Sequence, residues 1–201
     1  YCLQNKTIKD NYDLKGWFYK RENAEDILKK IHNPDIIALS NFVWNTQLNH
    51  KLAKEIKKKY PKCKVIFGGL GNPNKNRLDN FLEENDYIDI VVNGEGELTF
   101  EHILVESLKD EPNYKNVEGI STRDFITNDR QRIKDIDSMP SPYLDGLFNK
   151  IIDGSSAVFE STIESVRGCP YQCTFCEIGD KYFQKISRQS NEKVAKNILP
   201  L

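Results

Sequence analysis

Short apolar runs and amphipathic stretches alternate along the first half of the chain. The apolar runs have the length of buried strands and lie at residues 17–20, 36–40, 64–67 and 88–92. Apolar residues recur at helical spacing between and after these runs, and we expect helices at residues 23–31, 46–59, 76–84 and 98–108. Strands that alternate with helices form βαβ units around a parallel sheet. The pattern therefore predicts an α/β fold with a doubly wound parallel sheet.

The second half of the chain is less regular. Segments of β type at residues 118–122 and 131–133 predict a small hairpin, and the Pro-rich stretch 139–143 predicts a linker. Residues 157–166 alternate as a strand that runs into a cysteine-rich loop, and residues 190–198 predict a helix. We accordingly expect a first domain over residues 1–137, a linker over residues 138–156 and the start of a second domain over residues 157–201.

We expect further structure before the first residue and after the last residue of this chain. One strand, one loop and one helix after residue 157 cannot bury a core by themselves, so we expect a larger second domain in the whole protein. Residues 1–15 are expected to be the tail of a helix whose strand is missing, and the chain does not begin with methionine. We therefore expect a piece truncated at both ends, without its N-terminal strand, that is inactive on its own.

Composition narrows the classes of partner. The 29 basic and 30 acidic side chains give a net charge of −1, which indicates neither nucleic acid nor an anionic membrane as a partner. No apolar run approaches the roughly 18 residues that span a bilayer. The five cysteines are an odd number, three of them are clustered, and no signal peptide precedes them. We therefore expect a cytoplasmic protein whose clustered thiols bind a metal rather than each other.

The clustered cysteines are Cys169, Cys173 and Cys176, with the spacing Cys-x3-Cys-x2-Cys. Three close thiolates on an irregular loop can bind three irons of a cubane cluster and leave the fourth iron open to a small molecule. A structural zinc site would be closed by a fourth Cys or His at a matching offset, and the three histidines all lie in the first predicted domain. The spacing favours an iron–sulfur cluster, and a zinc site or three unrelated thiols is the alternative.

This loop, with Phe175 before its last cysteine and Arg167-Gly-Cys-Pro-Tyr171 at its start, resembles the Cys-x3-Cys-x-aromatic-Cys signature of radical S-adenosylmethionine (SAM) enzymes. The resemblance implies that the three cysteines hold a [4Fe–4S] cluster whose fourth iron binds SAM. One electron from the cluster then cleaves SAM to a 5′-deoxyadenosyl radical. It also implies that Phe175 lines the adenine side of the pocket, with plain packing under the cluster as the alternative. It further implies that residues 157–201 are the first β/α unit of a partial TIM barrel.

The first domain carries serine and glycine where its predicted strands end. Ser40 follows one strand, Gly68 and Gly69 follow the next, and the turn 94–97 follows a later one. In a parallel sheet these ends share one edge, beyond which ligands bind. These elements resemble the Ser-x-Leu and Gly-Gly elements of cobalamin-binding domains, and Ser141-Pro-Tyr143 resembles the linker of B12-dependent radical SAM proteins. The resemblance spans nearly the whole chain.

The resemblance implies a Rossmann-like cobalamin-binding domain with its ligand at that edge. Glycine lets the backbone approach a flat corrin closely, and a hydroxyl or a backbone N–H can bond the nucleotide tail. Several of these positions also have a plain structural explanation, since Gly-Gly is common after such strands, a tight turn can simply begin a helix, and a tryptophan is often core. The residues expected to contact cobalamin are Ser40, Trp44, Asn45, Gly68, Gly69, Gly94, Glu95 and Gly96.

Other conspicuous residues are expected to be ordinary. We expect Cys2 and Cys63 to be plain thiols rather than metal ligands. His50 stands among lysines in the middle of a predicted helix and is expected to be solvated. The lysine-rich run 54–62 is expected to be a solvated helix face.

Together the two resemblances imply a cobalamin-dependent radical SAM enzyme, a methyltransferase that acts on an unactivated carbon of a small-molecule substrate. The radical would abstract a substrate hydrogen, and methylcobalamin would deliver the methyl group. A reductant such as flavodoxin or ferredoxin is the usual electron donor in the superfamily. The alternatives are a cobalamin-free radical SAM enzyme, of the methylthiotransferase or cyclase type, and a non-catalytic cobalamin-binding module.

Overall fold

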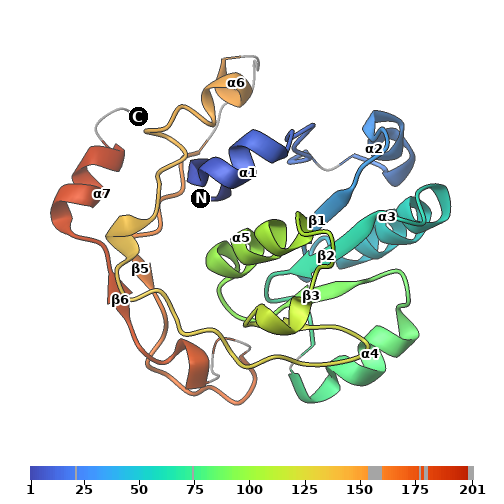
Figure 1. Cartoon of the computed structure of the whole chain (residues 1–201). Helices are drawn as coiled ribbons and strands as arrows, with labels where there is room; N and C mark the ends of the chain where they lie inside the picture. Colours follow the sequence, from blue (N-terminus) through green and yellow to red (C-terminus); the bar gives the residue numbers. More distant parts are fainter. Residues whose placement is uncertain (21, 74, 154–159, 177, 179–180, 199–201) are drawn as a thin grey trace. The chain divides into compact units, whose positions relative to one another are not determined.

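The computed structural model describes residues 1–20, 22–73, 75–153, 160–176, 178 and 181–198. The chain folds as two compact units (Figure 1): Cys2–Gln131 form the first, and Arg132–Leu201, with Tyr1, form the second. The predicted limits of the first domain and of the linker stay predictions. Among the helices that the structure describes, none combines the length and the apolar character that crossing a membrane requires.

The first unit is built on a four-stranded sheet in which each strand pairs with the next one along the chain (Figure 1). The strands are β1 (Ile36–Ser40), β2 (Lys64–Gly68), β3 (Ile90–Val92) and β4 (Ile120–Ser121). β1, β2 and β3 run parallel, with Ser40 opposite Gly68 and Phe67 opposite Val91, whereas β4 runs antiparallel to β3. The predicted parallel sheet is confirmed for three strands, and the fourth strand makes the sheet mixed.

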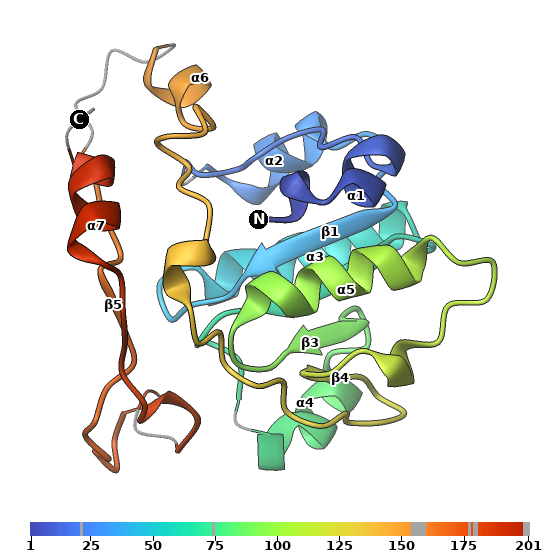
Figure 2. The same ribbon diagram turned by 60° about the vertical axis from the view of Figure 1, so that its left-hand side comes forward.

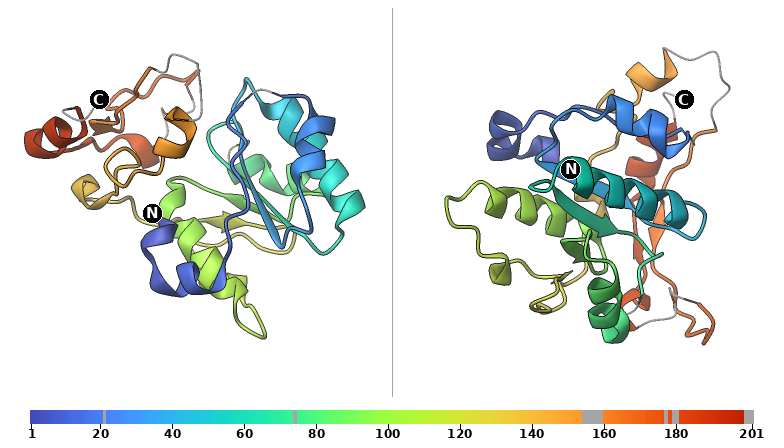
Figure 3. Two further views of the ribbon diagram at one scale, coloured as in Figure 1. Left: turned by 90° about the horizontal axis from the view of Figure 1, so that it is seen from above. Right: turned by 90° about the vertical axis from the view of Figure 1, so that its right-hand side faces the viewer.

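Helices cover both faces of this sheet, as predicted for a doubly wound fold. On one face Phe67 and Val91 are buried under α2 (Ala24–Lys30), α3 (Thr46–Lys59) and α4 (Leu78–Glu84). On the other face Ile66 and Ile90 are buried under α5 (Gly96–Ser107), and α1 (Lys6–Asn11) packs against α5. Seen from above, α1 and α5 lie on one side of the strands and α2 and α3 on the other (Figure 3, left).

Local sequence explains where several helices begin. The side chain of Asn23 accepts a hydrogen bond from the N–H of Asp26 at 3.0 Å, as the predicted start of α2 requires. Asn5 caps α1 in the same manner, and its amide also donates to Glu101 on α5. α5 begins at Gly96, two residues before its predicted start, so the predicted glycine turn continues as the first turn of a helix.

The predicted strand at residues 17–20 is wrong. In the described part of the chain these residues pair with no strand, and Trp17, Phe18 and Tyr19 are exposed. Aromatic residues form a strand only where a neighbouring strand takes up their backbone hydrogen bonds. The segment instead runs as an irregular connection from α1 to α2 (Figure 2).

The predicted hairpin is confirmed in its first arm and wrong in its second. β4 turns back so that Ser121 pairs with Ile126, and the N–H of Gly119 donates to the carbonyl of Asn128 at 2.8 Å. The second arm is therefore residues 126–130, which we call the return strand, and not residues 131–133. The hairpin is also no separate element, because β4 extends the main sheet.

The second unit has less regular structure. β5 (Val166–Arg167) and β6 (Ser187–Arg188) pair antiparallel on either side of the cysteine loop, and α6 (Asn149–Ile152) precedes them. The predicted helix near the end of the chain is confirmed as α7 (Asn191–Ile198). Of the strand predicted at 157–166, residues 157–159 lie outside the described residues, and of the rest only Val166 pairs with another strand. Short 3-10 helices are η1 (Cys2–Gln4), η2 (Lys75–Arg77), η3 (Tyr114–Asn116), η4 (Ile136–Ser138) and η6 (Lys181–Phe183).

His50 on α3 is not the solvated residue that we expected. Its half-buried ring packs edge-on against the rings of Phe67, Phe81 and Tyr87, and its Nδ1 atom lies 2.6 Å from the Tyr87 hydroxyl. Burial lowers the pKa of His50 below its ordinary value, and the nearby Lys54 ammonium lowers it further. The folded chain therefore holds His50 neutral at a pH where the unfolded chain protonates it.

The first unit is expected to lose stability in mild acid through His50. Because the folded pKa lies below the unfolded value of about 6.5, the neutral ring stabilises the fold above that pH, and this contribution is lost as the pH falls toward the folded pKa. His50→Gln removes the titration. Urea unfolding at about pH 7.5 and about pH 5.5 should show a larger loss of unfolding free energy in the wild type than in His50→Gln. Equal losses would contradict this role.

Candidate functional site

The carboxyl ends of the three parallel strands lie along one edge of the sheet, which we call the carboxyl edge. Ser40 ends β1 and stands directly opposite Gly68, which ends β2. β3 ends beside them at Val92 and continues into Asn93 and Gly94. The structure thus brings the predicted serine and glycines together at one edge, where ligands bind in α/β sheets of this kind.

Asn41, directly after β1, ties the ends of β1 and β2 together. The residue is completely buried. Its N–H donates to the carbonyl of Gly68 at 2.6 Å, and its carbonyl accepts from the N–H of Gly71 at 2.8 Å. Its side-chain amide donates to the Gly71 carbonyl and to Asn72 Oδ1, both at 3.1 Å. Asn41 was not among the expected site residues, although an amide directly after a buried strand is typical of a turn former.

Asn45 and Asn49 hold the other side of the same loop. Asn45 accepts from the N–H of Phe42 and donates to the carbonyl of Ser40, both at 2.8 Å. Asn49 also donates to the Ser40 carbonyl, at 3.0 Å. Both polar groups of Asn45 therefore bond the loop itself, and its contact with a ligand stays a prediction.

The glycines after β2 are required by the packing of these loops. Gly69 has a φ of +90°, and a Cβ built there would lie 2.6 Å from the carbonyl oxygen of Asn41. A Cβ built at Gly71 would lie 2.8 Å from the Cα atom of Phe42. Both distances are too short for real atoms, so each position needs glycine. Gly69 therefore allows the loop after β2 to pack closely against the loop after β1.

The glycine that ends β2 and the glycine that begins α5 are in less crowded surroundings. A Cβ built at Gly68 or at Gly96 meets only the side chain of Val92, at 3.9 Å. Gly94 turns the chain with a φ of +73°, and Glu95 after it is buried. α5 begins here, so the N–H groups of its first turn lie at the carboxyl edge. The small residues at these two positions leave room for the close approach of a flat ligand.

A stacked aromatic pair, half-buried Phe42 and exposed Trp44, stands beside the end of β1. The rings of Phe42 and Trp44 are stacked, with centroids 4.7 Å apart and planes 2° from parallel. Val43 and Trp44 are 86% and 69% exposed. The alternative that places Trp44 in the core is therefore wrong. Exposed apolar groups gathered at a strand end are typical of a binding surface.

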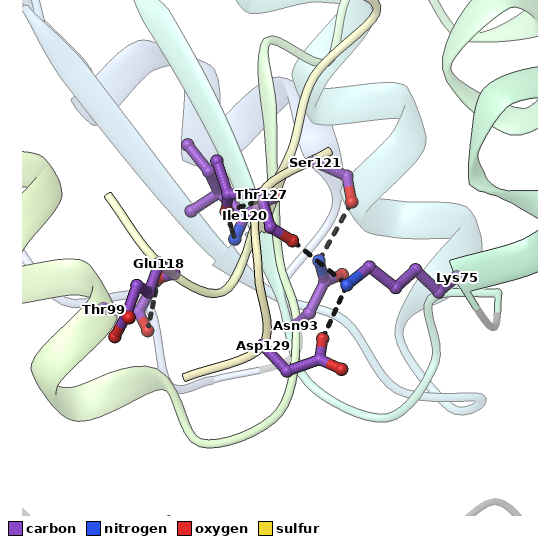
Figure 4. Close-up of polar contacts among 8 residues, drawn as sticks. All are labelled: Lys75, Asn93, Thr99, Glu118, Ile120, Ser121, Thr127 and Asp129. Carbon is purple, nitrogen blue, oxygen red and sulfur yellow. Dashed lines mark hydrogen bonds and ion pairs between the residues drawn. The ribbon is translucent and has the colours of Figure 1, made fainter. Parts of the chain in front are cut away.

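Lys75 connects the chain after β2 with the return strand (Figure 4). Its Nζ atom lies 2.7 Å from Asp129 Oδ1 and donates to the carbonyl of Thr127 at 3.0 Å. At the end of β3, the amide of Asn93 donates to Ser121 Oγ at 2.9 Å. Lys75 was not expected at the site, because nothing in its local sequence sets it apart from other lysines.

The cysteine loop lies between β5 and β6. The N–H of Cys169 donates to the carbonyl of Phe183 at 2.8 Å, and the N–H of Cys176 donates to the carbonyl of Cys173 at 3.1 Å. Gly168 has a φ of +107°, and a Cβ there would collide with the carbonyl oxygen of Lys185. Glycine is therefore required where the loop leaves β5.

The three loop cysteines have the chemistry of cluster ligands. None of them is in a disulfide, and Cys173 and Cys176 are exposed while Cys169 is half-buried. Phe175 is 91% exposed. Within the residues that the structure describes, no three His, Cys, Asp or Glu side chains gather closely enough to hold a metal ion. The donor set fits an iron–sulfur cluster, but the loop does not bring the three sulfurs together, and their ligand role stays a prediction.

The other two cysteines have the character of plain thiols. Cys63 is buried in the core, and burial raises its pKa to about 11. Burial also raises the pKa of Cys2. Burial therefore disfavours the thiolate form at both residues.

The fold and the carboxyl edge match a known domain family. Residues 12–104 match the B12 binding domain family, and this span contains all the residues expected to contact cobalamin. The first unit therefore holds a B12-binding domain. Across both units, the chain is similar to radical SAM methyltransferases.

Two curated relatives align with almost the whole chain. The chain is 32% identical over 209 residues to the cobalamin-dependent radical SAM methyltransferase TokK of Streptomyces tokunonensis. It is 31% identical over 209 residues to the 2-(S-pantetheinyl)-carbapenam-3-carboxylate methyltransferase of Streptantibioticus cattleyicolor. Each alignment covers 98% of this chain and 30% of the relative. The chain thus spans less than a third of the length of these relatives.

Solved structures of the radical S-adenosylmethionine methyltransferase TsrM from Kitasatospora setae share the fold. The TM-score is 0.56, at 14% identity, for TsrM with cobalamin and a [4Fe–4S] cluster bound. It is 0.57, at 13% identity, for TsrM with tryptophan substrate and a SAM analog bound. These matches cover 89% of this chain and 37% and 36% of the TsrM chains. At this identity the likeness concerns the fold alone.

Gly69→Ala is expected to destabilise the carboxyl edge. The new Cβ meets the Asn41 carbonyl and the positive φ disfavours a side chain, so we expect the unfolding free energy to fall by about 1–3 kcal/mol. Gly68→Ala is the matched control, because its Cβ meets only Val92 at 3.9 Å, and a change below about 1 kcal/mol is expected. Chemical denaturation measures both variants, and equal losses would show that Gly69 has no special role.

Proposed function

We propose that this chain is part of a cobalamin-dependent radical SAM methyltransferase that methylates an unactivated carbon of a small-molecule substrate. One observation carries the proposal. A B12-binding domain with an accessible carboxyl edge is followed, in the same chain, by a loop with three free cysteines at the radical SAM spacing. The names of the two curated relatives, both methyltransferases and one of them cobalamin-dependent, support the reaction class.

In this proposal Cys169, Cys173 and Cys176 hold a [4Fe–4S] cluster. Two of the three thiols are exposed and none is oxidised to a disulfide, so the loop is chemically ready to take up iron. When bound, the cluster supplies the electron that cleaves SAM. Phe175, the exposed aromatic residue next to Cys176, covers the adenine side of SAM.

The proposal assigns the carboxyl edge to cobalamin. The side chain of Ser40 and the stacked ring of Trp44 offer a hydroxyl and an apolar face, and the open backbone at Gly68 and Gly96 admits a flat ring. The four other expected residues shape the loops that carry these groups. Two are glycines with positive φ, one has its side chain bonded within the loop, and one is buried. They are Asn45, Gly69, Gly94 and Glu95.

The thiols also indicate the setting in which the enzyme works. All five cysteines are free, and a radical SAM cluster needs a one-electron reductant. We therefore propose a reducing, cytoplasmic environment with a flavodoxin or a ferredoxin as the electron donor.

Anaerobic reconstitution of the full-length protein with iron, sulfide and hydroxocobalamin tests the proposal. After desalting, we expect about four irons per chain together with retained corrin absorption. Iron without corrin would point to a cobalamin-free radical enzyme, and corrin without iron to a binding module. Loss of both would contradict the proposal.

Cysteine variants make the same experiment specific to the loop. Cys173→Ala is expected to leave less than about a tenth of the iron and to abolish 5′-deoxyadenosine formation from SAM, because a cubane needs all three thiolates. Cys2→Ala removes a thiol outside the loop and should behave as wild type. Full iron in Cys173→Ala would exclude the loop as the cluster site.

Trp44→Ala is expected to weaken corrinoid binding without affecting iron. Loss of the stacked, exposed ring should raise the dissociation constant of hydroxocobalamin roughly threefold to tenfold, measured by titration in the visible spectrum. Trp17→Ala is the control. Trp17 is also exposed, but it lies in the connection from α1 to α2 and not in a loop that follows a strand of the sheet. Equal affinity in Trp44→Ala and wild type would remove Trp44 from the site.

A further inference from the structure

The chain that leaves β2 is anchored on both sides of the carboxyl edge. Near its start, Gly71 and Asn72 bond Asn41 at the end of β1. Farther along, Lys75 bonds Thr127 and Asp129 of the return strand (Figure 4). Because the strand order is β1-β2-β3-β4, the two anchors lie on opposite sides of β2 and β3. The chain after β2 is therefore tied to the end of β1 through Asn41 and to the hairpin beyond β3 through Lys75.

The partner of Lys75 is held firmly by the main sheet. The N–H of Thr127 donates to the carbonyl of Ile120 on β4 at 3.0 Å, and the N–H of Ile120 donates back to the Thr127 hydroxyl at 3.0 Å. At the base of the hairpin, Thr99 on α5 donates to the carbonyl of Glu118 at 3.3 Å. The Thr127 carbonyl that Lys75 bonds therefore belongs to a hairpin that β4 and α5 hold in place.

The Lys75 ammonium also has capacity for another partner. An ammonium carries three donors, and the structure describes two acceptors for them, the Thr127 carbonyl and Asp129. The side chains of Lys75 and Asp129 are 36% and 62% exposed, so the ion pair is solvated and weak in itself. A phosphate oxygen is an acceptor of the kind that a partly exposed lysine binds well.

We propose that Lys75 is a positioning residue for the phosphodiester of the nucleotide tail of cobalamin. The inference rests on the proposed function, and it concerns the tail rather than the corrin ring. Lys75 acts through its charge, because its bonds to Thr127 and Asp129 hold the ammonium where it can meet the phosphodiester. A corrinoid without the tail gains nothing from that charge.

Release of bound corrinoid from the full-length protein tests this inference. Hydroxocobalamin, or dicyanocobinamide, which lacks the nucleotide tail, is loaded and its dissociation is followed in the visible spectrum. Lys75→Met is expected to speed the release of cobalamin roughly threefold to tenfold and to leave the release of cobinamide unchanged. Lys75→Arg keeps the charge and the donors and should release cobalamin at nearly the wild-type rate.

Matched variants separate the inference from general damage. Lys58→Met, which breaks an exposed ion pair with Glu55 on α3, should leave both rates unchanged. The double variant Lys75→Met, Asp129→Asn should still release cobalamin faster than wild type, because the phosphodiester of the tail still lacks a cation. A wild-type rate in Lys75→Met, its restoration in the double variant, or equal acceleration of both corrinoids would overturn the inference while corrinoid binding stands. A wild-type protein that retains no corrinoid would overturn the proposed function and the inference together.

Discussion

One buried amide, that of Asn41, sets the shape of the carboxyl edge. Its backbone bonds Gly68 and Gly71, its side chain bonds Asn72, and Asn49 donates to its side-chain oxygen at 3.3 Å. Leaving a buried amide without one of its hydrogen-bond partners costs about 1–3 kcal/mol of folding free energy. Breaking any one of these contacts is therefore expected to weaken the others. The loop after β1, the glycine loop after β2 and the start of α3 are therefore one cooperative joint.

The two proposed cofactor sites differ in how firmly the described hydrogen bonds fix their loops. At the carboxyl edge, the loops are already fixed by buried hydrogen bonds, and open backbone is already presented beside Val92. In the cysteine loop the described contacts are backbone hydrogen bonds at Cys169 and Cys176, and the sulfurs are not gathered. Metal binding commonly supplies the free energy that orders such a loop.

Sequence patterns predicted the elements whose burial is local and periodic. The helix at 46–59 and the strands at 36–40 and 64–67 follow from apolar spacing, and the structure confirms them. The strand expected at 17–20 failed because pairing depends on a neighbour that apolar content alone does not show. Asn41 and Lys75 escaped notice for a related reason, since their partners Asn72 and Asp129 lie 31 and 54 residues away. Strand ends located the candidate site, but the side chains that build it are joined by long-range contacts.

The hairpin makes the two borders of the sheet unequal. β4 is two residues long, its outer side pairs with the return strand, and a lysine bonds the Thr127 carbonyl beyond it. Short strands and lysines of this kind protect a sheet against unwanted pairing. β1 is five residues long and, among the described residues, pairs with β2 alone. The two borders of the sheet therefore differ: the outer side of β4 bonds the hairpin arm that follows it, whereas the described ladder bonds of β1 all lie on its β2 side.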